Sequence, residues 1–192
     1  IQKADLVTPD GSGIVWGANY LGTPLKERVS GIDLLWEICR QAPEKQWRIY
    51  LLGAAPGIAQ KAADNLKSKY PHIQIVGVRN GYFDGNAPSQ VEEILADIEK
   101  AAPDVLFVAM GAPRQEYFID DYRERIGAKV AIGVGGSFDV VAGTVKRAPV
   151  FMQKMGIEWL WRLLCQPSRW KRMLNLPRFV RLVKHTRKQQ SK

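Results

Sequence analysis

Two turns in the sequence carry groups that could bind the parts of a nucleotide. The turn GAAPG, from Gly53 to Gly57, joins an apolar run to an amphipathic segment. A glycine turn between a strand and a helix offers free backbone N–H groups to a phosphate. In the turn NGYFDG, Tyr82 and Phe83 could flank a flat ring or simply cover the core as loop aromatic residues. The phosphate signal is weak by itself, because the first turn lacks a P-loop lysine and the spacing GxGxxG.

A third turn, GVGGSFD, combines glycines with a carboxylate. Gly135 and Gly136 follow an apolar run of strand length, and Asp139 falls in the first turn of a short predicted helix. The Asp139 carboxylate could accept hydrogen bonds from a ribose diol or cap the helix, and the sequence favours neither role. Phe138 stands where a dinucleotide fingerprint needs its third glycine, so a Rossmann cofactor site is only weakly supported.

Three further polar residues occupy positions that a ligand could approach. Asp10 lies beside Gly11 and Gly13 at the predicted end of a strand, although an Asx-turn is the ordinary role of such an aspartate. Arg28 precedes a predicted helix, and by itself it is typical of a surface arginine. Gln115 lies in the segment MGAPRQE, directly after an apolar run. In open α/β sheets, ligands bind at this carboxyl edge of the strands.

The elements that must position these residues alternate between strands and helices. The run from Val105 to Met110 is apolar without a polar alternate, which indicates a central strand buried on both faces. Five segments of the βα type follow one another, and this order predicts an α/β fold with a Rossmann-like, mostly parallel sheet and helices on both faces. The predicted strands are residues 4–7, 47–52, 73–78, 105–110 and the apolar run in KVAIGVGG, and helices include 14–20, 58–70, 91–101 and 117–126.

Composition argues against several classes of protein. The two cysteines, Cys39 and Cys165, lie far apart, which indicates a reducing compartment rather than a disulfide framework. No apolar run approaches the roughly 18 to 20 residues of a membrane span. The ten aspartates include no DxD pair, and neither histidine has a nucleophile motif near it. A metal-held diphosphate and Ser-His-Asp hydrolysis are therefore unsupported, and we predict neither a metal site nor a cofactor.

The charge is concentrated at the C-terminal end. Residues 146–192 hold 13 Lys and Arg against one acidic residue, whereas residues 1–145 hold 15 against 18. Basic residues recur every three or four positions from Arg178 onward, with apolar residues between them, as in a helix that lies on an anionic bilayer. We therefore predict an α/β core over residues 1–145 and a basic helical appendage over 146–192 that associates with a membrane.

Several stretches together resemble one family of enzymes, the WecG/TagA/CpsF family of bacterial glycosyltransferases. The matching stretches, in family order, are ADLVTPDGSGIVWGANYLG, ERVSGIDLL, GAAPG, NGYF, MGAPRQE, GVGGSFDVVAGTVKRAP and GIEWLWRLLCQPSRWKR. The resemblance implies transfer of N-acetylmannosamine, or its uronic acid, from a UDP-sugar donor to a lipid-linked GlcNAc acceptor on undecaprenyl diphosphate. Family chains usually begin some tens of residues earlier, with a segment whose Thr/Asn motif lines the active site. That segment is absent here, so either the chain is truncated or part of the pocket is missing.

The resemblance also implies roles for the residues named above. Asp10 would be the general base of an inverting displacement, and Gln115 would hold the sugar or the acceptor. Tyr82 and Asp139 would hold uracil and ribose. Without a metal, arginines would neutralise the departing UDP. These arginines are Arg28, Arg162, Arg169 and Arg172.

The expected location is cytoplasmic, peripheral on the inner face of the plasma membrane, with the anionic membrane surface as a partner and a homo-oligomer left open. Two other classes compete with this interpretation. A nucleotide-dependent enzyme such as a dehydrogenase is disfavoured by the interrupted GxGxxG. An RNA-binding module that uses the basic end is disfavoured because the chain has no RNP or similar signature, so no nucleic acid is predicted as a partner.

Overall fold

The computed structural model describes residues 3–85, 87–165, 167, 170 and 174–190. The chain forms two compact units. The first unit comprises Ile1–Asp5 and Gly31–Lys146, and the second comprises Leu6–Ser30 and Arg147–Lys192. The sequence predicts one boundary between residues 145 and 146. The structure places a boundary one residue later and, in addition, groups residues 6–30 with the C-terminal segment.

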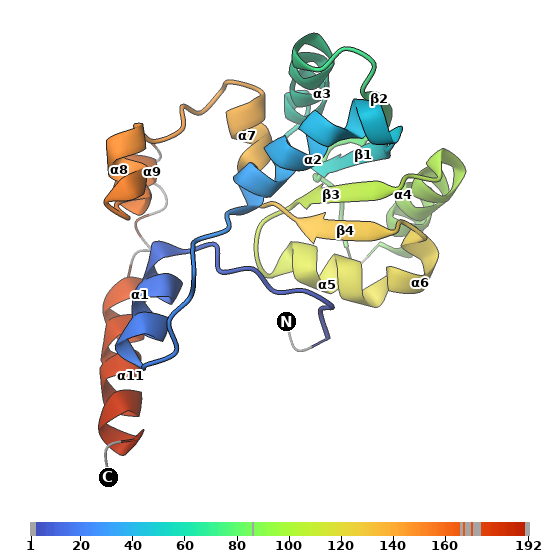
Figure 1. The fold of residues 1–192 in the computed structure, drawn as a ribbon. Coiled ribbons are helices and arrows are strands. Elements are labelled where there is room, and N and C mark those ends of the chain that lie inside the picture. The colour runs from blue at the N-terminus through green and yellow to red at the C-terminus, as the bar shows by residue number, and fades with distance from the viewer. Residues whose placement is uncertain (1–2, 86, 166, 168–169, 171–173, 191–192) are drawn as a thin grey trace. The chain divides into compact units, whose positions relative to one another are not determined.

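The first unit is a parallel α/β sheet, as predicted (Figure 1). Its strands lie in the order β2-β1-β3-β4, and every neighbouring pair is parallel. The register sets Ile49 beside Val105 and Phe107 beside Ile132. The elements of this unit are α2 (Gly31–Lys45), β1 (Arg48–Gly53), α3 (Ile58–Lys69), β2 (Gln74–Arg79), α4 (Pro88–Ala101), β3 (Val105–Ala109), α5 (Arg114–Asp121), α6 (Arg123–Ile126), β4 (Val130–Gly133) and α7 (Ser137–Val141).

Helices cover both faces of this sheet, because its central strands are apolar on both sides. In β3, Phe107 packs with α2, α3 and α7, whereas Leu106 and Val108 pack with α4, α5 and α6. Each of these three side chains is fully buried, and burial of one such side chain contributes about 1.5–3 kcal/mol. Tyr50 of β1 extends over β2, where a Cβ at Gly77 would lie 2.2 Å from its ring. Burial and a hydrogen bond to Asp97 raise the pKa of the Tyr50 hydroxyl.

Two predicted elements differ from the structure. The expected strand at residues 4–7 is wrong, since this segment is irregular and its apolar side chains Leu6 and Val7 are 82% and 60% exposed. Nearby, Lys3 and Asp5 form ion pairs with Asp120 and Arg123. The expected helix over residues 117–126 is two helices, α5 and α6, which meet at Tyr122.

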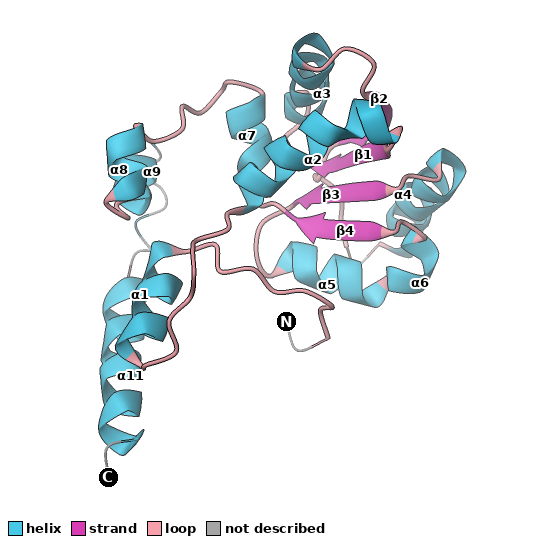
Figure 2. Ribbon diagram, in the orientation of Figure 1, coloured by secondary structure: helices cyan, strands magenta, loops and turns pink. Residues whose placement is uncertain are grey.

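The second unit is helical (Figure 2). It contains α1 (Ser12–Tyr20), α8 (Val150–Lys154), α9 (Glu158–Cys165) and α11 (Asn175–Gln190). Gly17 of α1 lies so close to α11 that an added Cβ would be 3.1 Å from the Phe179 ring. Arg187 of α11 donates to the Tyr20 carbonyl and lies over the Tyr20 ring. These contacts between α1 and α11 explain why residues 6–30 belong with the C-terminal segment.

Candidate functional site

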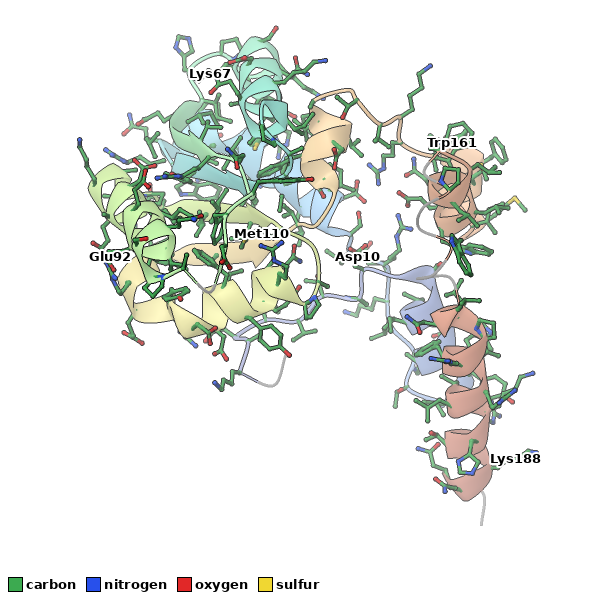
Figure 3. The ribbon with its side chains drawn as sticks, turned by 180° about the vertical axis from the view of Figure 1, so that it is seen from behind. Asp10, Lys67, Glu92, Met110, Trp161 and Lys188 are labelled. Atoms are coloured by element: carbon green, nitrogen blue, oxygen red, sulfur yellow. The ribbon has the colours of Figure 1, made fainter. Side chains whose placement is uncertain are left out.

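The first unit has one edge that is suited to binding a ligand. After β1 the chain enters α3 on one face of the sheet, and after β3 it enters α5 on the other face. The two loops therefore diverge at the carboxyl ends of neighbouring strands. In open α/β sheets, ligands bind in the crevice at this point. Met110, which follows β3, marks the edge in Figure 3.

The loop after β1 is fixed by close backbone packing. Gly53 has φ +134°, and a Cβ there would lie 2.5 Å from the Ala109 carbonyl carbon. The Ala54 N–H donates to the Ala109 carbonyl at 2.8 Å. Gly57, with φ +81°, then begins α3 without a side-chain cap. The predicted glycines Gly53 and Gly57 thus hold this loop against β3 and lead it into the N-terminus of α3.

The two aromatic residues after β2 have different environments. Phe83 packs edge-on against Phe118 and covers the core. Tyr82 is 75% exposed, and its backbone N–H donates to the Asn80 side chain at 3.0 Å. Tyr82 is therefore the member of the pair whose ring is open to a ligand.

The loop after β4 is braced by Gln115. The side chain of Gln115 is only 5% exposed and fills the space above Gly133, where a Cβ would lie 2.4 Å from its amide nitrogen. Its amide oxygen accepts a hydrogen bond of 2.9 Å from the Gly135 N–H. Its amide nitrogen donates to the Glu116 carboxylate at 2.8 Å. Gln115 thus sets the position of the turn that contains Gly135 and Gly136.

Asp139 follows this turn in α7. The N-cap of α7 is Gly136, and no side chain caps the helix. The Asp139 backbone carbonyl accepts from Thr144 and Val145, which closes the end of the helix. The Asp139 carboxylate has no hydrogen bond or ion pair with the residues that the structure describes. Of the two roles that the sequence left open, capping α7 is thus not the one observed.

Asp10 belongs to the second unit and lies on the segment that leads into α1 (Figure 3). Asp10 was expected at the end of a strand, but the segment before it is irregular. The adjacent Pro9 carbonyl accepts from the Val29 N–H at 3.1 Å, and the Ser12 hydroxyl donates to the Gly156 carbonyl at 2.8 Å. The exposed Asp10 carboxylate forms no Asx-turn and has no ion pair within the described part of the chain. The backbone on each side of Asp10 is thus anchored, whereas its side chain is open.

Arg28 is not a plain surface arginine. One of its guanidinium nitrogens, Nη1, lies 3.0 Å from Oε2 of Glu158, in the first turn of α9. The two side chains are only 21% and 11% exposed. This ion pair joins the segment of Asp10 to the basic C-terminal part of the same unit.

The other predicted arginines are Arg162, Arg169 and Arg172. Arg162 lies in α9, but its side chain is not among those described. Arg169 and Arg172 lie outside the described residues. Their predicted contacts with a diphosphate therefore stay predictions.

Trp159 and one side of α11 border a groove of about 790 Å³ within the second unit. Apolar and basic side chains share its lining. Lys188, at the C-terminal end of the groove, is labelled on α11 in Figure 3. The lining residues are Trp159, Leu176, Pro177, Val180, Arg181, Lys184, His185 and Lys188.

None of the helices among the described residues is both long and apolar enough to span a bilayer. Within the same ranges, no group of three or more His, Cys, Asp or Glu side chains could hold a metal ion.

Comparison with known proteins gives a match along the entire chain. The sequence profile of the glycosyl transferase WecG/TagA/CpsF family matches residues 1–192. The chain belongs to this family. A protein of Bacillus spizizenii is 40% identical over 188 residues, which are 97% of this chain and 71% of that protein. Proteins of Bacillus subtilis and Staphylococcus aureus are 38% and 35% identical, over 95% and 98% of this chain and 70% and 72% of their own lengths.

Each of these three relatives is named N-acetylglucosaminyldiphosphoundecaprenol N-acetyl-beta-D-mannosaminyltransferase. Membership of the WecG/TagA/CpsF family confirms the family that the sequence motifs indicated. It also makes this chain a glycosyltransferase of the hexosyl type. The parallel α/β sheet confirms the predicted fold class.

Two residues that hold candidate site residues in place, Glu116 and Glu158, were not predicted from the sequence. Glu116 holds the amide of Gln115, and its position next to Gln115 on α5 was the available signal. Glu158 pairs with Arg28, and it is the only acidic residue among residues 146–192. A single carboxylate among 13 basic residues was a signal that it has a specific partner.

Proposed function

We propose that this chain transfers N-acetylmannosamine, or its uronic acid, from UDP to GlcNAc that is linked to undecaprenyl diphosphate. The product would serve bacterial cell-surface polysaccharide or wall teichoic acid synthesis. The observation that carries the proposal is the match of 95–98% of the chain to relatives that are named for mannosaminyl transfer.

The first unit supplies the proposed donor site. The backbone N–H groups at the N-terminus of α3, which no described side chain caps, suit a phosphate because they carry partial positive charge. The exposed ring of Tyr82 suits the flat uracil, and the carboxylate of Asp139 suits a ribose diol. The turn of Gly135 and Gly136, which Gln115 braces, lies between β4 and Asp139, and a Cβ added at Gly135 would meet no described atom within 4 Å.

Asp10 is the proposed general base. Its carboxylate takes the proton from the 4-hydroxyl of the acceptor as that oxygen bonds to the anomeric carbon of the donor sugar. The bond from this carbon to the UDP oxygen breaks, and UDP leaves with the electron pair. Attack opposite to the leaving group inverts the anomeric carbon.

Arginines are proposed to neutralise the diphosphate as it leaves, because a guanidinium binds phosphate oxygens in bidentate fashion. The sequence offers Arg162, Arg169 and Arg172 for this role, in addition to Arg28. Arg28 contacts Glu158 in the structure, so its part in catalysis requires a separate test.

The transfer itself is tested by incubating the chain with UDP-ManNAc or UDP-ManNAcA and a short lipid-linked GlcNAc acceptor. Formation of the disaccharide from one donor would support the proposal and identify the sugar. If both donors give no disaccharide while a different UDP-hexose does, the proposed donor is wrong.

Metal independence is a prediction of its own, since the sequence has no DxD pair and a surplus of arginines. Addition of EDTA to the same assay should leave the initial rate of transfer unchanged. A matched reaction with EDTA and excess Mg²⁺ controls for chelation of other components. Complete loss of transfer with EDTA, with recovery in Mg²⁺ or Mn²⁺, would contradict it.

We also propose that α11 binds the inner face of the plasma membrane. Each Lys or Arg near an anionic surface contributes about 1 kcal/mol to binding. Replacement of Arg178, Arg181 and Lys184 by Gln should therefore lower the partition coefficient onto anionic liposomes by roughly 10²-fold. The effect should shrink as salt screens the charges.

A matched control removes three positive charges elsewhere, by Lys61→Gln, Lys67→Gln and Lys100→Gln on α3 and α4. This control should bind the liposomes almost as the unchanged chain does. Equal losses in both triple variants would show a response to net charge alone.

In contrast, Arg169→Ala with Arg172→Ala should impair transfer even to a short, water-soluble acceptor.

A further inference from the structure

The two oxygens of the Glu116 carboxylate have different surroundings. Oε1 accepts from the Gln115 amide, but Oε2 has almost no accessible surface and no hydrogen bond to any residue that the structure describes. A buried acceptor without a donor destabilises a folded protein, and a charged acceptor does so more strongly. An unsatisfied group of this kind in a folded protein calls for an explanation.

The position of Glu116 places this oxygen next to the proposed donor site. Glu116 lies in the first turn of α5, the helix that follows β3. Through Gln115 it is connected to Gly133 and Gly135, at the carboxyl end of β4. All of these residues belong to the first unit. The buried oxygen thus lies at the same edge of the sheet as the loops proposed to bind the nucleotide.

The two oxygens of Glu116 have separable tasks. Oε1 fixes the orientation of the Gln115 amide, so that the amide oxygen faces the Gly135 N–H. A carboxylate only accepts hydrogen bonds, so Oε2 requires a hydroxyl or an N–H group. A nucleotide sugar carries both kinds of donor, on its ribose, its sugar ring and its acetamido group.

We infer that Glu116 is a substrate-positioning residue, whose Oε1 holds the Gln115 brace and whose Oε2 accepts a hydrogen bond from a hydroxyl or amide N–H of the bound UDP-sugar. This inference rests on the proposed function and adds to it a specific acceptor for the donor substrate.

The variant Glu116→Gln separates the two tasks. Its side-chain oxygen can still accept from Gln115, whereas its NH₂ group replaces the free acceptor with a donor. Titration calorimetry on the full chain with UDP-ManNAc should then show a Kd that is roughly 10- to 100-fold higher, as for loss of a hydrogen bond to a charged group. The ¹H–¹⁵N signal of Gly135 should stay where it is, because the brace persists.

Two further variants and a second ligand complete the experiment. Glu124→Gln changes an exposed carboxylate on α6 and should leave the Kd unchanged. Gln115→Met removes the brace while keeping the length of the side chain, and it should move the Gly135 signal. Titration with UDP alone locates the donor group: weaker binding of both ligands assigns it to the nucleotide, and weaker binding of UDP-ManNAc alone assigns it to the sugar.

Equal affinities of the unchanged chain and Glu116→Gln for both ligands would overturn the inference alone and leave the proposed function standing. A shifted Gly135 signal in Glu116→Gln would also overturn it, because the two tasks would then not be separable. Failure of the unchanged chain to bind either ligand would instead overturn the proposed function, and the role of Glu116 with it.

Discussion

Asp10→Asn should lower the turnover of the transferase by roughly 10²- to 10⁴-fold, the usual contribution of a general base. Asparagine has the size of aspartate but cannot take the proton from the acceptor hydroxyl. The Asp10 side chain is exposed and has no ion pair within the described ranges, so the substitution should not affect folding. The affinity for UDP, measured by calorimetry, should stay close to that of the unchanged chain.

Two aspartates serve as controls for this prediction. Asp64→Asn alters an exposed carboxylate on α3 and should change neither turnover nor affinity. Asp139→Asn should weaken nucleotide binding, because its carboxylate is proposed to bind the ribose. An unchanged rate in Asp10→Asn would exclude this residue as the base, and a loss of UDP affinity equal to the loss of rate would make it a binding residue.

The fold was predictable wherever neighbouring residues carry the signal. The five residues from Val105 to Ala109 are all buried in β3, as their unbroken apolar run indicated. The turn at the end of β1 was also predictable, because its glycine marks a special backbone conformation. Gly53 adopts φ +134° and lies against the backbone of Ala109. Such features depend on local periodicity and on the conformational freedom of glycine, which a single sequence shows.

The segment at residues 4–7, in which three of the four residues are apolar, had a composition suited to a strand but the wrong surroundings. Composition does not show whether a neighbouring strand is present to complete the hydrogen bonds. Here Lys3 and Asp5 contact Asp120 and Arg123, at the end of α5 and the start of α6. These ion pairs join residues that are far apart in the sequence, so local patterns could not predict them.

The contacts of the candidate site residues could not be predicted from the sequence for the same reason. Gln115 was expected to contact a substrate. In the structure its side chain is buried and fills the space above Gly133. Arg28 was typical of a surface residue, but Glu158 holds it as an ion pair. The types of these residues pointed to one edge of the sheet and to the segment before α2, whereas their partners depend on packing between distant parts of the chain.

Arg28→Ala should lower the free energy of unfolding by about 3 kcal/mol, because removal of one partner from a largely buried ion pair is costly. The partner, Glu158, is only 11% exposed and begins α9, which carries Trp159 and Trp161. Urea denaturation followed by tryptophan fluorescence should report this loss. Arg125→Ala, which breaks exposed pairs with Glu92 and Glu99, should change stability only slightly.

The same pair shows whether Arg28 also acts on the diphosphate. The double variant Arg28→Met with Glu158→Leu should recover most of the lost stability, because apolar side chains often replace a buried ion pair without cost. If Arg28 binds the leaving group, transfer to a water-soluble acceptor should remain impaired in this stable double variant. Recovery of transfer together with stability would mean that Arg28 serves only to join the Asp10 segment to α9. In that case, the neutralising charge would have to come from the other arginines.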